Sequence, residues 1–229
     1  MNNSNASNYV REMIEYYNRR APWHDDYMSF NGFPAMEKLL RPIIDTIAPY
    51  VTNKDILEIA CGTGNWTGLI SQRAKSVLAG DSSERSLDIA GRKLKDIKNI
   101  TLREFDAFNL DTGNLKFDTI FAADWYSHIP NSSTIPFLQT LIPLLRLEGT
   151  IIIHDIIKIP EIEKDYFATD EDGNRLYKRS LPDGSEFMVI KNYPTREDLK
   201  NISQSLGLNL EYYFFEELKR WLAIFQKRA

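Results

Sequence analysis

The sequence is poor in the residues that build disulfide frameworks, metal clusters and membrane spans. It holds one cysteine, Cys61, and three histidines among 229 residues. This excludes an internal disulfide framework and leaves little material for a zinc site, so we expect no bound metal. No apolar run reaches the roughly 18 residues that a membrane span needs, and the polar start MNNSNASNYVREM has no apolar signal-peptide core. We therefore expect a cytoplasmic protein with no membrane partner.

The chain also lacks an excess of basic residues. Its formal net charge is -4, whereas proteins that bind nucleic acid usually show a basic patch, so we expect no nucleic-acid partner. Hydrophobic residues make up 43% of the chain, which is enough for one substantial core. These features indicate a globular protein, which we expect to be a monomer or a homodimer.

From residue 55 the chain alternates between apolar strands and amphipathic helices. Strands are predicted at residues 56–60, 76–80, 100–105, 117–123 and 149–155. Repeated strand–helix units with apolar strands indicate a parallel sheet that is covered by helices on both faces. Before them we predict helices over 8–18 and 35–50, and between the later strands a helix over 133–147 that Pro143 kinks.

The rhythm breaks after the fifth strand. A hairpin is predicted around Pro182, Asp183 and Gly184. A capped helix should begin at Thr195, and two closing strands follow within residues 208–228.

The turn after the first strand, within DILEIACGTGNWTG (residues 55–68), is typical of a nucleotide-binding site. A dinucleotide fold needs G-x-G-x-x-G here. Gly62 and Gly64 supply two glycines, but Thr67 stands where the third belongs. If the motif is started two residues earlier, Ala60 stands at its first glycine position and Asn65 at its last. A nicotinamide oxidoreductase is therefore only a remote alternative.

Glu58 lies at the end of this strand, where its carboxylate would repel a pyrophosphate and suit a cationic ligand. The pattern Glu58-x-Ala60-x-Gly62-x-Gly64 resembles motif I of the class I S-adenosylmethionine-dependent methyltransferases, with alanine for the usual first glycine. S-adenosylmethionine carries an ammonium and a sulfonium and no phosphate. The resemblance implies that this turn wraps the methionine and ribose parts of that cofactor.

Further motifs of the family follow in the expected order at the ends of the next strands. By the resemblance, Asp81 with Ser82 would hold the ribose hydroxyls, and Asp106 with Ala107 the adenine. Asp124, in the segment AADWYSHIP, would lie beside the methionine part. All of these positions are at carboxyl ends of predicted parallel strands, where open α/β sheets bind ligands.

The two ends of the chain resemble small-molecule members of the family. In YYNRRAPWHDDYM the likeness would place Tyr17 against the cofactor and Arg20 at its carboxylate. The insert LPDGSEFMVIKNYPTREDL is similar to one bacterial subgroup. The resemblance implies a single domain over 1–229, with a helical cover at 1–50 and a substrate-cover insert at 156–193. Its fold would be a Rossmann-like, doubly wound, seven-stranded sheet, mostly parallel, with an antiparallel C-terminal edge strand.

The implied activity is methyl transfer to an oxygen or nitrogen of a small molecule. His128 and His154 are the candidate proton acceptors, and Tyr126 is a candidate for an aromatic wall at the acceptor. Aromatic and basic residues of the insert favour an aromatic or carboxylate-bearing acceptor. An RNA or protein methyltransferase, and a non-catalytic protein that binds S-adenosylmethionine, stay as alternatives. Structural roles also stay open for two of the cofactor candidates. Glu58 can be a buried strand acid that is paired for stability, and Asp81 can cap the following helix.

Overall fold

A seven-stranded sheet forms the centre of the molecule, in the order β3-β2-β1-β4-β5-β10-β9. The computed structural model describes residues 3–27 and 32–227. The strands are β1 (Asp55–Ile59), β2 (Ser76–Asp81), β3 (Ile100–Glu104), β4 (Phe117–Ala123), β5 (Leu145–Ile156), β9 (Leu208–Phe215) and β10 (Arg220–Lys227). All five strands predicted from the strand–helix rhythm are present, as are the two closing strands.

The first five strands pair in parallel, and β10 pairs antiparallel with both β5 and β9. The strand that runs against the others is therefore β10, which lies between β5 and the edge strand β9. The predicted Rossmann-like, mostly parallel sheet is confirmed. Because the order reverses between β1 and β4, the carboxyl ends of these two strands form a switch point, where α/β sheets bind ligands.

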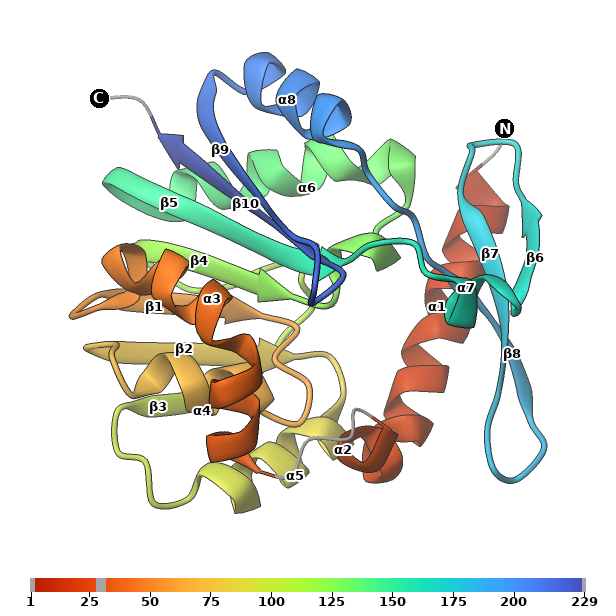
Figure 1. Ribbon diagram of the computed structural model, residues 1–229, viewed down its shortest axis with the longest axis horizontal. Helices are drawn as coiled ribbons and strands as arrows, with labels where there is room; N and C mark the ends of the chain where they lie inside the picture. The colour runs from red at the N-terminus through yellow and green to blue at the C-terminus, as the bar shows by residue number, and fades with distance from the viewer. Residues whose placement is uncertain (1–2, 28–31, 228–229) are drawn as a thin grey trace.

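Helices cover both faces of this sheet (Figure 1). One face carries α3 (Phe33–Val51), α4 (Asn65–Ser71) and α5 (Glu84–Leu94), and the other carries α6 (Thr134–Leu141) and α8 (Arg196–Ser205). Successive side chains of a strand point to opposite faces. Accordingly Ile56 packs in the core with α3 and α4, whereas Leu57 packs in the core with α6 and α8.

Side chains cap the first turns of two of these helices, and one of them begins at Thr195 as predicted. The Ser83 hydroxyl accepts a hydrogen bond from the backbone N–H of Ser86 at the start of α5. Thr195 and Asp198 form a reciprocal capping box at the start of α8. The helix predicted over 133–147 ends earlier, because a 3-10 turn, Ile142–Leu144, contains Pro143 and leads directly into β5. Proline has no backbone N–H to donate to an α-helical ladder.

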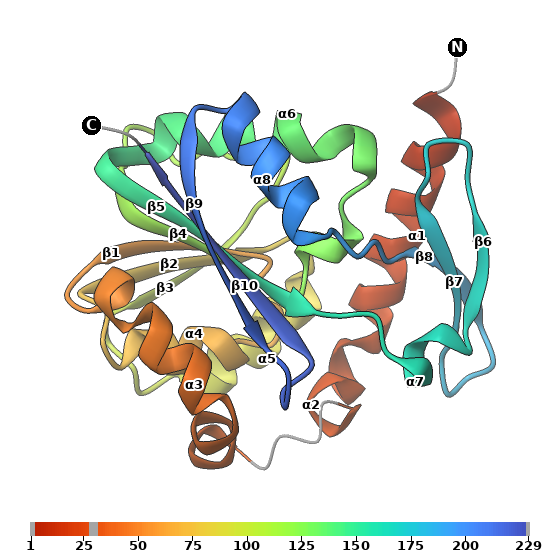
Figure 2. The same ribbon diagram turned by 45° about the horizontal axis from the view of Figure 1, so that its top comes forward.

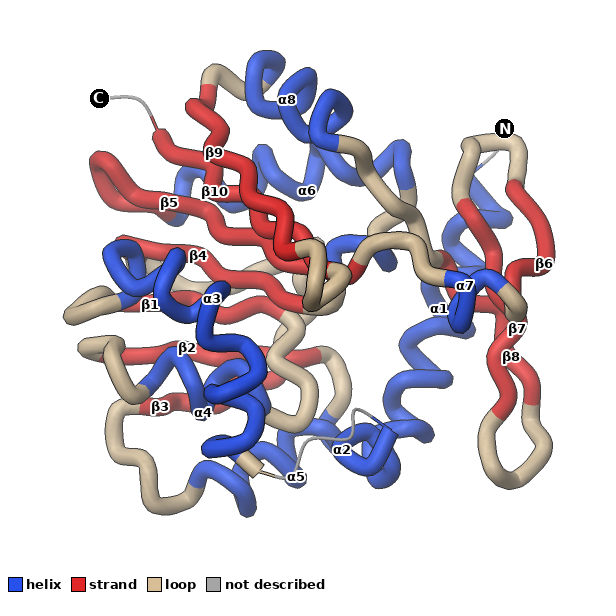
Figure 3. The backbone as a smooth tube through the Cα atoms, in the orientation of Figure 1, coloured by secondary structure: helices blue, strands red, loops and turns tan. Residues whose placement is uncertain are grey.

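A second, three-stranded sheet stands beside the N-terminal helix (Figures 1 and 3). Helix α1 (Asn3–Arg20) packs on strands β7 (Arg175–Ser180) and β8 (Glu186–Ile190), and β6 (Tyr166–Thr169) completes the sheet. The predicted hairpin is the β7–β8 pair, whereas β6 was not predicted. Short α7 (Pro160–Glu163) connects β5 to this sheet. The turned view shows the same layer across from the carboxyl ends of the parallel strands (Figure 2).

Four short helical segments complete the description: η1 (Ala21–Trp23), α2 (His24–Tyr27), η2 (Tyr126–His128) and η3 (Asn131–Ser133). None of the described helices combines the length and apolar character required to cross a bilayer.

Candidate functional site

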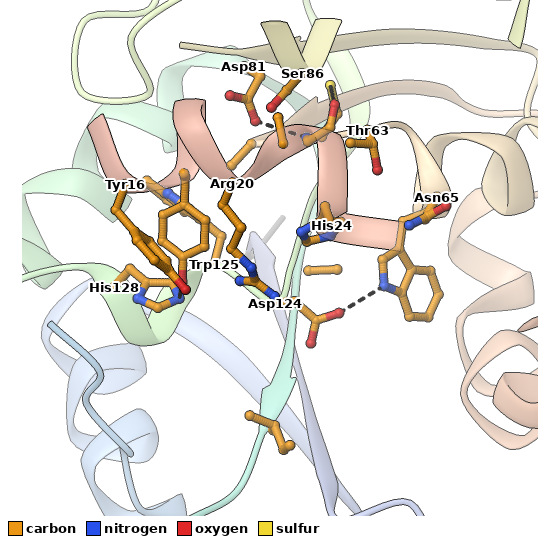
Figure 4. A pocket seen from close by; sticks show the side chains of 18 of the residues that line it. Tyr16, Arg20, His24, Thr63, Asn65, Asp81, Ser86, Asp124, Trp125 and His128 are labelled. Atoms are coloured by element: carbon orange, nitrogen blue, oxygen red, sulfur yellow. Dashed lines mark hydrogen bonds between the residues drawn. The ribbon is translucent and has the colours of Figure 1, made fainter. Parts of the chain in front are cut away.

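A cavity of about 250 Å³ lies at the carboxyl ends of β1, β2 and β4 and extends to α1 and the second sheet. Figure 4 shows side chains of its wall, with Asp81 and His128 in different parts of the pocket and Arg20 drawn between His128 and Asp124. Titratable residues of both signs line it: Arg20, His24, Glu58, Asp81, Asp124, His128, Arg179, Lys191 and Arg220. Such a concentration of ionisable groups in one concave region is typical of a functional site.

The glycine turn closes one end of the cavity with backbone rather than side chains. Gly62 and Gly64 have φ of 55° and 81°, and Ala60 between the strand and the turn has φ of 54°. A Cβ on Gly64 would lie 2.7 Å from Leu94 Cδ1 of α5, so that position has no room for a side chain. A Cβ on Gly62 would meet nothing within 4 Å. The turn therefore packs on α5 at Gly64 and exposes its backbone to the cavity at Gly62.

Glu58 is an acid buried at the floor of this end. Only 2% of it is exposed, and its Oε2 has no hydrogen-bond partner among the described residues. Burial raises the pKa of Glu58 to about 8; the Thr67 hydroxyl beside it lowers the pKa in part, and the nearby charge of Asp81 raises it. A buried carboxylate without a partner is costly, and a bound cation would relieve that cost.

Asp81 ties the end of β2 to the glycine turn. Its Oδ2 accepts a hydrogen bond from the Gly62 N–H at 2.8 Å, and its Oδ1 accepts one from the Ser83 N–H at 2.9 Å. Burial raises the pKa of Asp81, which these backbone hydrogen bonds counteract. Each carboxylate oxygen keeps a further lone pair, so Asp81 can still accept hydrogen bonds from a ligand.

At the other end, His128 on η2 meets Tyr17 of α1. His128 Nδ1 lies 2.5 Å from the carbonyl oxygen of Ile190, and Nε2 lies 2.8 Å from the Tyr17 hydroxyl. A carbonyl only accepts, so Nδ1 carries the proton and Nε2 accepts from Tyr17. Burial, with Lys191 and other cations nearby, holds the pKa of His128 well below its usual range. The imidazole is therefore neutral at physiological pH, with its Nε2 lone pair directed to Tyr17.

Asp124 lies between these two ends in a left-handed conformation, with φ of 57°. It accepts hydrogen bonds from the Arg220 guanidinium and from Trp66 Nε1, the latter at 3.3 Å. Burial would raise the pKa of Asp124, but the Arg220 charge holds it well below the usual value. His154 is fully buried next to this group, and the centroid of its ring lies 4.9 Å from that of Trp66.

The N-terminal segment is attached to the glycine turn through Asp25 of α2. Its Oδ1 accepts hydrogen bonds from Thr63 Oγ1 at 2.7 Å and from Asn65 Nδ2 at 3.0 Å. Its Oδ2 lies 2.6 Å from the ammonium of Lys93 on α5. The N-terminal segment that covers the cavity is therefore attached to the glycine turn, which also lines the cavity.

The structure brings eight of the predicted site residues to the wall of this cavity: Tyr17, Arg20, Glu58, Ala60, Gly62, Asp81, Asp124 and His128. Six others are not among its lining residues: Gly64, Ser82, Asp106, Ala107, Tyr126 and His154.

Gly64 and Ser82 belong to the turns that shape the cavity, but Asp106 is exposed and accepts a hydrogen bond from Phe108 N within its own turn. Tyr126 lines a separate hollow beside α8. His154 does not reach the cavity, because the side chains of Trp66 and Arg220, which do line it, lie against its ring.

Sequence reasoning missed Asp25, Lys93 and Arg220. Nothing in the local pattern marks Arg220, which comes to the site only because β10 pairs antiparallel with β5 and sets it opposite Ile156. In the described part of the chain, no group of three or more His, Cys, Asp or Glu side chains could hold a metal ion.

Comparisons with known proteins agree with this geometry. Residues 56–149 match the family model of a methyltransferase domain. The chain is 26% identical over 218 residues to an uncharacterized methyltransferase of Staphylococcus carnosus (strain TM300), an alignment that covers 94% of this chain and 100% of that protein. It is 25% identical over 223 residues to the ubiquinone biosynthesis O-methyltransferase of Acinetobacter baumannii (strain ACICU), covering 93% of this chain and 90% of the relative.

Among solved structures, the DhpI-SAM-HEP complex superposes with a TM-score of 0.77 at 24% identity, covering 96% of this chain and 98% of that one. At this level of identity the likeness shows a shared fold.

Proposed function

We infer that this chain, which belongs to the class I S-adenosylmethionine-dependent methyltransferases, transfers a methyl group to an oxygen or nitrogen of a small molecule. The observation that carries the inference is the chemical difference between the two ends of one cavity. One end offers backbone, the buried acid Glu58 and the partly buried carboxylate of Asp81, and the other offers a neutral imidazole with a hydrogen-bond acceptor.

The residues of the first end fit S-adenosylmethionine. Glu58 Oε2 lacks a partner among the described groups, and the ammonium of the cofactor can supply one. The backbone at Gly62 faces open space, and Asp81 beside it can accept the ribose hydroxyls. Arg20 lines the same cavity and carries the charge that the cofactor carboxylate needs. These assignments, and those of Ser82, Asp106 and Ala107 around the adenosine, are proposals.

The residues of the second end suit the methyl acceptor. When bound, the cofactor supplies a methyl group already activated on a sulfonium. The contribution of the protein is to align the acceptor atom and exclude water, and alignment is worth up to about 7–11 kcal/mol in well-oriented systems. In the empty site His128 Nε2 accepts a hydrogen bond from Tyr17. When the methyl acceptor displaces the Tyr17 hydroxyl, Nε2 takes the proton that a hydroxyl or protonated amine loses as its bond to the methyl carbon forms. A positioned proton acceptor contributes about 10²–10⁴-fold to the rate.

The cover of the site is small, which favours a small acceptor. Tyr16, Tyr17 and Trp125 supply aromatic wall, and the insert contributes Arg179 and Lys191. We propose that residues 1–50 and 156–193 together enclose an aromatic or carboxylate-bearing molecule.

Two alternatives have less support. An RNA or protein methyltransferase needs an exposed binding groove, whereas His128 is buried beneath α1 and the second sheet. A non-catalytic protein that binds the cofactor would not need the acceptor end. We expect a cytoplasmic enzyme, on the basis of its single cysteine, and a monomer or homodimer.

The test combines binding and turnover. Isothermal titration should detect S-adenosylmethionine and S-adenosylhomocysteine, and an assay for released S-adenosylhomocysteine should detect transfer to hydroxyl and amino acceptors. Asp81→Asn should weaken cofactor binding, whereas Asp88→Asn, an exposed aspartate on α5 outside the cavity, should not. Binding without transfer to any acceptor would favour the non-catalytic alternative, and absence of binding would refute the assignment.

A further inference from the structure

The ring of His128 and the residue before it are held by one short segment of the second sheet. His128 Nδ1 donates a hydrogen bond to the carbonyl oxygen of Ile190, where β8 ends. The ammonium of the next residue, Lys191, donates to Ser127 Oγ at 2.8 Å. The backbone N–H of Asn192 then donates to the carbonyl oxygen of Ser127 at 2.7 Å. Three consecutive residues of the insert therefore contact η2, the segment that carries the candidate proton acceptor.

Ser127 is also held from the other side, by the main sheet. Its backbone N–H donates a hydrogen bond to Asp155 Oδ2 near the end of β5, at 2.9 Å. The N–H, the carbonyl and the hydroxyl of Ser127 thus all have partners, and the residue is 1% exposed. Ser127 consequently lies between a carboxylate of the main sheet and the Lys191 ammonium of the insert.

Asp155 and Lys191 are charged residues that stability alone does not explain. Asp155 is 0% exposed and Lys191 is 8% exposed, and Nζ lies 3.6 Å from Asp155 Oδ1. Asp155 Oδ1 also accepts a hydrogen bond from the Ile156 N–H at 2.8 Å. Buried charges are costly, and replacing a buried ion pair by apolar residues is often neutral or stabilising. The pair is better explained by what it does to Ser127 than by a gain in stability.

On the basis of the proposed function, we propose that Lys191 is a positioning residue for methyl transfer, which acts on His128 through Ser127. Asp155 holds the same serine from the main sheet, at whose strand ends we place the cofactor. The position of Nε2 relative to the cofactor is then set across both sheets through one residue. Such alignment matters, because a misplacement of about 1 Å can lower a rate about 10²-fold.

The first measurement needs no methyl acceptor. The chain has three histidines, His24, His128 and His154, so NMR of the full chain with labelled histidine ring nitrogens gives few signals, and the signal lost in His128→Asn identifies His128. Lys191→Met should speed exchange of the His128 Nδ1 hydrogen with water about tenfold or more, because it removes a charged hydrogen bond to Ser127. Exchange of backbone N–H groups in β1 and β4 should stay as in wild type.

Two further variants supply the controls. Lys178→Met makes the same substitution on the second sheet, at an exposed side chain that pairs with Glu186 outside the cavity, and should leave exchange at His128 unchanged. Ser127→Ala removes the hydroxyl that accepts from Lys191 and should also speed this exchange. The variant with both Ser127→Ala and Lys191→Met should be no faster than the faster of the two single variants, because both remove the same hydrogen bond.

The second measurement is turnover, with a hydroxyl or amino acceptor for which wild type releases S-adenosylhomocysteine. Lys191→Met should lower kcat about tenfold and leave affinity for S-adenosylhomocysteine unchanged. Added to His128→Asn, it should lower kcat no further, because the group that it positions is absent. If Lys191 instead held the acceptor directly, its loss would lower turnover in both backgrounds.

Four results would overturn the proposal: unchanged exchange at His128 in Lys191→Met, equal acceleration by Lys178→Met, acceleration throughout β1 and β4, or a loss of kcat that persists in His128→Asn. In each case wild type still binds S-adenosylhomocysteine and transfers the methyl group, so the proposed function stands. Failure of wild type to bind S-adenosylhomocysteine, or to methylate any acceptor, would instead refute the proposed function.

Discussion

The buried acid at the floor of the cavity should make cofactor affinity depend on pH. In the empty protein the pKa of Glu58 is raised to about 8 by burial, so the carboxyl is mostly protonated at pH 7. A cationic ligand at Glu58 favours the ionised form and must displace that proton. Binding should therefore release about 0.9 proton per site at pH 7, which follows from a pKa near 8 that falls well below 6 in the complex.

The same values give the size of the effect on affinity. Ionising Glu58 in the empty site costs about 2.7 kcal/mol at pH 6 and about 0.8 kcal/mol at pH 7.5, at 1.36 kcal/mol for each pKa unit. The association constant for S-adenosylmethionine should thus rise roughly 20-fold between these two pH values. Glu58→Gln cannot ionise, so its affinity should be lower at pH 7.5 and nearly independent of pH in this range.

Calorimetry in two buffers of different ionisation enthalpy measures the released proton directly, and titrations from pH 6 to 7.5 measure the slope. The amino group of the cofactor titrates near the upper end of this range, but equally so for both proteins. The difference between wild type and Glu58→Gln therefore isolates Glu58. Cofactor binding with no proton release, or the same slope in the variant, would refute a role for Glu58 at the ammonium.

Stability of the empty protein should show the opposite trend. The folded-state pKa of Glu58, about 8, exceeds its ordinary value of 4.5, so its contribution to stability is fully present below pH 4.5 and is lost as pH rises through 8. The loss is at most about 5 kcal/mol. Thermal unfolding without ligand should find Glu58→Gln more stable than wild type by several degrees at pH 8 and by less at pH 5. Glu15→Gln, an exposed control on α1, should show no such difference.

Three further predictions concern other parts of the site. Gly64→Ala should lower the free energy of unfolding by about 2 kcal/mol, because its Cβ would meet Leu94 at a positive φ; denaturant titration should show a smaller loss for Gly113→Ala, whose Cβ meets nothing within 4 Å. Asp25→Asn should weaken S-adenosylhomocysteine binding several-fold in calorimetry with little change in melting temperature, since it loosens the attachment of α2 to the glycine turn; unchanged affinity would contradict this. His128→Asn should lower kcat about 10²–10⁴-fold in the transfer assay with unchanged cofactor affinity, and equal turnover would leave it a structural role.

The sequence predicts the features of this protein that depend on short stretches of chain. The glycine turn, Glu58 and Asp81 lie within 24 residues of one another, on two strands that pair in parallel with Glu58 opposite Ala79. Alternating strands and helices predict parallel strands, and the carboxyl ends of parallel strands lie at the same edge of the sheet. For this reason the positions of Glu58, Gly62 and Asp81 at one end of the cavity could be predicted from the sequence. Their role in binding the cofactor stays a prediction.

The acceptor end depends on contacts between segments that are distant in sequence. Tyr17 and His128 are 111 residues apart, and Glu12 accepts a hydrogen bond from the Met188 N–H across 176 residues. Neither contact follows from periodicity, because it depends on how α1 packs against the second sheet. The strand β6 was missed for the same reason, since its partner β7 determines its conformation.

His154 illustrates how a topological feature can override a local one. Its place at the end of a parallel strand predicted a residue at the site mouth, but β5 continues to Ile156 and pairs there with β10. The antiparallel strand brings Arg220 beside His154, and the side chains of Arg220 and Trp66 line the cavity in its place. The pairing of Arg220 with Asp124 then keeps a carboxylate ionised between the two ends.

The buried acid has a cost in the empty protein that folding alone does not explain. Glu58 Oε2 lacks a partner among the described residues, and burial keeps this acid mostly protonated at pH 7. An apolar residue of similar size would stabilise the empty protein, because a buried polar group without a partner is unfavourable. A cation that binds beside Glu58 supplies that partner and favours the ionised form. The acid is therefore better explained by an occupant of the cavity than by the stability of the empty fold.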